Sequence, residues 1–254
     1  MDPTTASSVP TSAAARSIAR WAGLGYLAIF ALAILANFAV VTRMVTPDDP
    51  AATMAAIAGD AATFRIGIAA FIAIAMIDVG LAWALHQVLR HTGEQRSLLA
   101  AWLRLAYSIV FATAVTFMAV ALHLATGGDA VAGLGDEARA AWVGTAMTAF
   151  DTAWLIGLVA FGLHLIVVAR ILVDARLASR ALGIALILAG GAYIADTFAH
   201  VLLPDYAAVA DVMLAVVAIP SMVGEMWLTV WLLRGGPRTA PAKPRRATRE
   251  AVPA

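Results

Sequence analysis

The residues best able to do chemistry in this sequence are acids and bases that stand inside long apolar runs. Asp151 and His164 lie within the run 140–170, and Asp78 and Glu225 lie within two other apolar runs. A run of this length and composition predicts a helix that crosses a membrane. Because a charged group is costly inside a bilayer, we expect these side chains to face the interior of a helical bundle and one another.

Two of these residues have the spacing of metal ligands. Asp196 and His200 stand four residues apart, so they share one face of a helix. Asp151 and His123 are expected at a similar depth on neighbouring helices, and the four together would suit zinc or another transition metal with room for a water molecule. The alternative is a hydrogen-bonded Asp196–His200 pair near the outer interface. The sequence identifies no other cofactor.

A second group is expected nearer the opposite membrane face. Arg104 and Glu225 each lie roughly 10–13 Å from the same predicted end of their helices, at 1.5 Å per residue. A buried arginine needs a carboxylate partner, so we predict that these two residues form an ion pair. The pair would clamp the third helix to the sixth, or else serve as a gate or as a grip on a phosphate or carboxylate. His164 is expected at a similar depth, and Asp78 near the midplane.

Composition sets the fold class. The chain has 254 residues, of which 62% are hydrophobic and 13% charged, and it has no cysteine. Soluble domains are roughly half apolar and a quarter charged, so the composition predicts a membrane protein. The absence of cysteine excludes disulfides and thiolate metal sites. We predict an all-α polytopic bundle of six transmembrane helices, over residues 21–41, 65–89, 98–125, 140–170, 180–203 and 207–233.

The domain organisation follows from these spans. Residues 16–234 are predicted to form one six-helix transmembrane domain, between a disordered tail (1–15) and a disordered basic tail (235–254). Residues 42–64 are predicted to form a loop with a short surface helix at 51–62. Pro220 is expected to kink the sixth helix. Small residues of the fourth helix, Gly157 and Gly162 among them, are expected to allow close helix packing.

The distribution of charge predicts the orientation. Most arginines outside the spans fall on the side of the two chain ends, whereas the other side is mainly acidic. The positive-inside rule then places both termini in the cytoplasm of a bacterium, with the protein spanning the plasma membrane many times. The expected partners are the lipid bilayer and a small apolar or lipid ligand. Nucleic-acid binding is not expected, and the sequence does not determine an oligomeric state.

Several stretches resemble a bacterial membrane family known as domain of unknown function 4386 (DUF4386). They are SIARWAGLGYLAIFALAILANF, FRIGIAAFIAIAMIDVGLAWALHQVLR, RLAYSIV, WLIGLVAFGLHLIVVARILV, SRALGIALILAGGAYIADTFAHVLLPDYAA and GEMWLTVWLLRG. Their order and spacing cover nearly the whole chain between the tails. The resemblance implies a compact helical protein of bacterial plasma membranes and implies no activity. The positions associated with the family pattern are Arg65, Asp78, Arg104, His164, Asp196 and Glu225, while Asn37 stands where many relatives would have an acid.

Three functions are compatible with this pattern. The first is small-molecule binding or proton-coupled transport, in which the interior acids carry protons. The second is an intramembrane enzyme, metal-dependent or acid–base, acting on a lipid or other apolar substrate. The third is a non-catalytic sensor or partner subunit. On the sixth predicted helix, Asp211, Ser221, Glu225 and Thr229 share one face. This face indicates a lined cavity or a proton path, and the alternative is that it packs against the third and fifth helices, which satisfy its polar groups.

Overall fold

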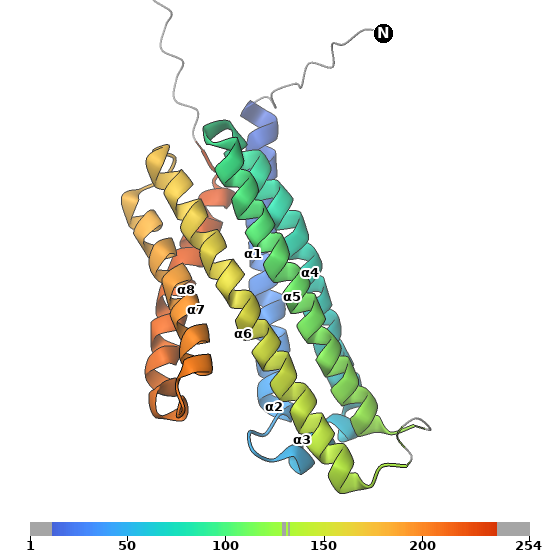
Figure 1. The fold of residues 1–254 in the computed structure, drawn as a ribbon. Coiled ribbons are helices and arrows are strands. Elements are labelled where there is room, and N and C mark those ends of the chain that lie inside the picture. Colours follow the sequence, from blue (N-terminus) through green and yellow to red (C-terminus); the bar gives the residue numbers. More distant parts are fainter. Residues whose placement is uncertain (1–11, 129–130, 132, 238–254) are drawn as a thin grey trace, which may run out of the picture.

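The computed structural model describes residues 12–128, 131 and 133–237, and these form a bundle of helices (Figure 1). In this part of the chain six helical segments are long and apolar enough to cross a membrane, as predicted. The long helices are α1 (Ser12–Ile34), α4 (Ala61–Leu89), α5 (Glu94–Thr126), α6 (Asp136–Asp174), α7 (Arg180–Leu202) and α8 (Ala210–Leu233). Of the tails predicted at 1–15 and 235–254, residues 1–11 and 238–254 lie outside the described residues.

The first span is longer than predicted and changes its winding. It begins at Ser12, so residues 12–15 are helical, although we predicted them to be part of the tail. It continues from α1 through a π-helical segment, Leu35–Val41, into the short helix α2 (Thr42–Met44). π-Helical turns are uncommon and occur often at functional sites. Asn37 lies within this segment, and its side-chain amide donates to the Ala33 carbonyl over 2.9 Å.

The predicted loop at 42–64 is largely helical. Helix α3 (Pro50–Gly59) begins where the Asp49 side chain accepts from the Ala52 amide, and α4 begins where Asp60 accepts from the Thr63 amide. Hydrogen bonds from Thr63 lower the pKa of Asp60. The short helix predicted at 51–62 is confirmed as α3, which lies at the surface of the bundle with one face packed, where Ile57 is fully buried.

The helices fall into a core and a hairpin. Helices α1, α4, α5 and α6 pack side by side, while α7 and α8 form an antiparallel hairpin that packs on α6 and α1 (Figure 1). At the crossing of α6 and α7, a Cβ added to Gly162 or Gly190 would collide with the backbone carbonyl of the other glycine. The close approach predicted for Gly162 is therefore confirmed. It holds α7 against α6 at the level of Gly162 and Gly190.

The first half of α8, next to the turn from α7, has no buried residue. The buried residues of α8 are Gly224, Leu228, Thr229 and Leu232, all in the half near the chain terminus. Pro220 lies inside α8 and lacks the amide that would bond to the carbonyl one turn earlier. The start of α1 and the end of α8 lie at the same end of the bundle, together with the α4–α5 and α6–α7 connections (Figure 1).

Candidate functional site

An arginine at the centre of the core organises the polar interior. Arg104 of α5 is 1% exposed, and its Nη2 donates to Oδ1 of Asp78 on α4, which is 2% exposed. Its Nη1 donates to the Tyr26 hydroxyl on α1 over 2.5 Å. The guanidinium carbon also lies 4.7 Å from the centroid of the Tyr26 ring and 5.3 Å from that of Phe161. Arg104 thus connects three helices through hydrogen bonds and a fourth through an aromatic face.

The predicted ion pair between Arg104 and Glu225 is wrong, because the carboxylate that pairs with Arg104 is Asp78. Helix α4 packs directly on α5, whereas α8 packs on α7 and α1. Glu225 instead accepts a hydrogen bond at Oε1 from the Tyr193 hydroxyl of α7 over 2.9 Å. A clamp through Arg104 exists, but it joins the third span to the first and second spans, not to the sixth.

His164 of α6 completes the network around Arg104. Its Nδ1 lies 2.8 Å from the Ala100 carbonyl oxygen, which can only accept, so Nδ1 carries the hydrogen. Its Nε2 lies 3.2 Å from Nη1 of Arg104, which can only donate, so Nε2 is the acceptor. The contact at Nε2 requires a neutral imidazole, and the two contacts together orient the ring between α5 and α6. The sequence placed His164 near Arg104, and the structure brings the two together.

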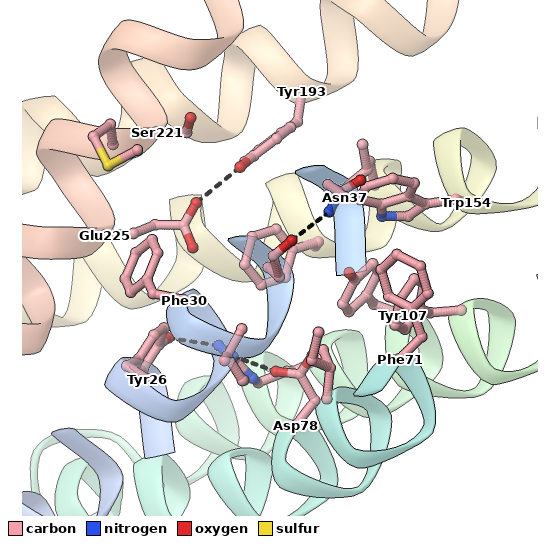
Figure 2. Close-up of a pocket in the computed structure, with 18 residues that line it drawn as sticks. Tyr26, Phe30, Asn37, Phe71, Asp78, Tyr107, Trp154, Tyr193, Ser221 and Glu225 are labelled. Atoms are coloured by element: carbon pink, nitrogen blue, oxygen red, sulfur yellow. Dashed lines mark hydrogen bonds and ion pairs between the residues drawn. The ribbon is translucent and has the colours of Figure 1, made fainter. Parts of the chain in front are cut away.

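A cavity of about 260 Å³ lies between this network and the α7–α8 hairpin. Figure 2 shows Asp78 on one side of it, and on the other side Glu225 and Tyr193 pointing toward each other. Most of the remaining wall is apolar or aromatic. The aromatic lining residues are Tyr26, Phe30, Phe71, Tyr107, Phe111, Trp154, Phe161 and Tyr193, and the polar ones include Asn37, Asp78, Arg104, Ser221 and Glu225.

Two buried polar atoms at the cavity have no partner among the described residues. They are Nε of Arg104 and the indole Nε1 of Trp154. Buried donors are usually satisfied by protein or by ordered water. Both side chains line the cavity, so a bound molecule or water there can supply acceptors.

Asp196 and His200 lie near the C-terminal end of α7. Nδ1 of His200 lies 3.6 Å from Oδ1 of Asp196 and 3.0 Å from the Asp196 carbonyl oxygen. The Tyr206 hydroxyl donates to the Asp196 carboxylate over 2.7 Å, and the Tyr206 ring stacks on His200 at 3.4 Å. Burial and the bond to Asp196 raise the pKa of Tyr206 above its usual value. The alternative of a hydrogen-bonded pair is therefore only partly met, because His200 bonds to the backbone carbonyl of Asp196 and the carboxylate of Asp196 bonds to Tyr206.

The structure does not bring the four predicted metal ligands together. Among the described residues, no group of three or more His, Asp or Glu side chains is arranged to hold a metal ion. Asp151 lines a separate hollow of about 910 Å³ with Asp48 and Asp49, between α6 and the segment before α3. His123 lies near the end of α5, beside Gly128. The Asp196 carboxylate is bonded to Tyr206 and forms no ligand set with Asp151 or His123.

Sequence reasoning missed Tyr26 and most of the aromatic wall. An arginine has five donors, more than one carboxylate can accept in one plane, so a further acceptor near Arg104 was to be expected. Nothing around Tyr26 distinguishes it from the other aromatic residues of the spans. The polar face predicted on the sixth span is partly confirmed, because Ser221 and Glu225 both line the cavity.

One comparison with known proteins, the comparison with family models, identifies a family for this chain. Neither the curated proteins nor the solved structures contain a match to this chain. A family model described as domain of unknown function (DUF4386) matches residues 21–236, which include every residue that lines the cavity. The match covers all six candidate spans in whole or in large part. The chain therefore belongs to the DUF4386 family of membrane proteins.

Proposed function

We propose that the protein binds a small, mainly apolar molecule that enters from the bilayer. The observation that carries the proposal is the cavity of about 260 Å³ between the Arg104 network and the α7–α8 hairpin. Ligand sites in proteins are concave and mostly apolar, with a few convergent polar groups that fix orientation. This cavity has that character, and its volume suits a compact molecule.

The rim of the cavity supports entry from the side. Met222 lines the cavity and is also 57% exposed on α8. Because α8 is a candidate membrane span, this exposed side chain faces lipid. A molecule dissolved in the bilayer can therefore reach the aromatic wall without crossing the aqueous loops.

Binding of neopentylbenzene, a compact neutral hydrocarbon, tests the proposal. The protein in lipid nanodiscs is expected to bind it above the level of empty nanodiscs in an equilibrium measurement. Ala33→Phe places a ring in the cavity from α1 and should abolish the binding. Ala31→Phe, on the exposed face of the same helix, is the matched control and should leave it intact. Equal binding by all three proteins would overturn the proposal.

Transport of the bound molecule is a second candidate function, and the exposed first half of α8 favours it. No residue of α8 before Gly224 is buried, and Pro220 removes one hydrogen bond of the helix just before Glu225. Movement of this half would open the cavity. We expect Pro220→Ala to slow dissociation of neopentylbenzene while changing its equilibrium affinity less.

We also propose that the protein spans the plasma membrane of a bacterium with both termini in the cytoplasm. The chain has no cysteine, so single cysteines can be introduced without background. His91→Cys in the α4–α5 turn should react with a membrane-impermeant maleimide only after the cells are opened. Leu134→Cys before α6 should react in intact spheroplasts. The opposite pattern would reverse the orientation.

A further inference from the structure

The formal charges that line the cavity do not cancel. Asp78, Arg104 and Glu225 are the lining residues with a charged side chain. Asp78 and Arg104 form an ion pair with each other. Among the described residues Glu225 takes part in no salt bridge, and its one side-chain hydrogen bond is the one from Tyr193. The cavity therefore holds one carboxylate without a cation.

We infer that the ligand is an organic monocation, a lipophilic amine or a quaternary ammonium compound, whose charge lies against the Glu225 carboxylate. The inference rests on the proposed function and names the chemical class of its ligand. A carboxylate within a membrane span is costly unless it is paired. A cationic ligand would complete the pairing that the protein itself makes for Asp78 but not for Glu225.

The aromatic wall suits the same ligand. The face of an aromatic ring attracts a cation, and quaternary ammonium groups are often held in cages of such rings. Tyr193, Phe30 and Trp154 line the cavity, as does Phe161. Phe161 and Tyr26 already receive the guanidinium of Arg104 over their faces. A second cation, on the side of Glu225, would meet rings of the same kind.

An anionic ligand fits the charges less well. Arg104 is neutralised by Asp78, and its two Nη atoms donate to Asp78, Tyr26 and His164. An anion in the cavity would stand near two carboxylates. The charge balance favours a cation, and the anion becomes an outcome of the test.

Three probes of similar size separate charge from shape. Benzyltrimethylammonium is a cation, neopentylbenzene has nearly the same shape without charge, and phenylmethanesulfonate is an anion. We expect the wild-type protein in nanodiscs to bind the cation at least about tenfold more tightly than the neutral probe, which corresponds to about 1.4 kcal/mol. Glu225→Gln should remove this difference between the two probes. Glu137→Gln, an exposed change of the same kind outside the cavity, should preserve the difference.

The outcomes distinguish this inference from the proposed function. Equal affinity of the wild type for the cation and for neopentylbenzene would overturn the inference of a cationic ligand and leave the proposed binding function in place. Tightest binding of phenylmethanesulfonate would overturn it as well and assign recognition to Arg104. If no probe binds, both proposals fall. The wild-type comparison decides even if Glu225→Gln does not fold, because it needs no variant.

Discussion

Two carboxylates on opposite sides of one cavity have contrasting surroundings. Asp78 is 2% exposed and pairs with Arg104, which in turn bonds to Tyr26 and His164. Glu225 is half-buried and receives one hydrogen bond, from Tyr193. Asp78 lies within the packed core of α1, α4, α5 and α6. Glu225 lies on α8, whose first half has no buried residue.

The two sides of the cavity therefore differ. We call the side of Asp78 and Arg104 the fixed wall, and the side of Glu225 and Tyr193 the adaptable wall. On the Asp78 side every charge is neutralised within the protein, so the packing there depends on no ligand. On the Glu225 side the negative charge lacks a cation among the described residues. We therefore expect charge at the first carboxylate to stabilise the fold, and we propose that charge at the second serves ligand binding.

The largest expected effect comes from breaking the fixed wall. Arg104→Gln leaves Asp78 buried without its cation, and removal of one partner from a buried ion pair typically costs about 3–5 kcal/mol. We expect a large fall in the thermal unfolding temperature of the protein in detergent. Arg96→Gln removes the same charge from an exposed pair with Asp174 and should change stability by at most about 1 kcal/mol.

The double variant Asp78→Asn with Arg104→Gln isolates the pairing. Removal of both charges leaves no uncompensated ion, so the double variant should be more stable than Arg104→Gln alone. Additive losses would show that the two residues act independently and would contradict the clamp.

A smaller effect is expected where the hairpin crosses the core. Gly190→Ala places a Cβ against the Gly162 carbonyl and should cost about 1–3 kcal/mol by overpacking. Gly191→Ala is the matched control, because a Cβ there meets no atom within 4 Å. In the interior of a helix that change should be neutral or stabilise by up to about 1 kcal/mol. Equal unfolding temperatures for both variants would show that the crossing does not hold the hairpin.

The spans were predictable because they depend on local composition. Apolar length and charge content along the chain set the six segments, and Pro47, Pro50 and Pro204 lie between them. Boundaries were less predictable, because they depend on caps. Asp60 starts α4 four residues before the predicted position by accepting from the Thr63 amide. The position of a span depends on the average composition of many residues, whereas its exact start depends on one capping side chain.

The pairing inside the bundle was not predictable from depth alone. Counting residues from the ends of the spans placed Arg104 at the level of Glu225, but this count says nothing of which helices are neighbours. In the structure α4 lies against α5, and Asp78 faces Arg104. The metal prediction failed for a different reason. Helix α6 packs on both α5 and α7, but depth does not set which way a side chain points, and Asp151 lines the hollow beside α3 while the Asp196 carboxylate bonds to Tyr206. His164 was placed correctly because α5 and α6 are consecutive and antiparallel, so a depth estimate suffices.

A further change sharpens the role of the adaptable wall. Tyr193→Phe removes the hydrogen bond to Glu225 and should lower stability by about 1 kcal/mol. Benzyltrimethylammonium should then raise the unfolding temperature more in this variant than in the wild type, because the ligand supplies a partner that the carboxylate has lost. An equal rise in both proteins would mean that the cation does not contact Glu225.

The smallest expected effect is the most informative about the comparison. Glu225→Gln should change stability by less than about 1 kcal/mol, because the amide oxygen can still accept from Tyr193 and no cation loses its partner. The corresponding Asp78→Asn should be strongly destabilising, because it leaves Arg104 without a counter-ion. Both are measured as unfolding temperatures in the same detergent, without a ligand. If Glu225→Gln were as damaging as Asp78→Asn, the two walls would have one role, and the charge of Glu225 would belong to the fold instead of to a ligand.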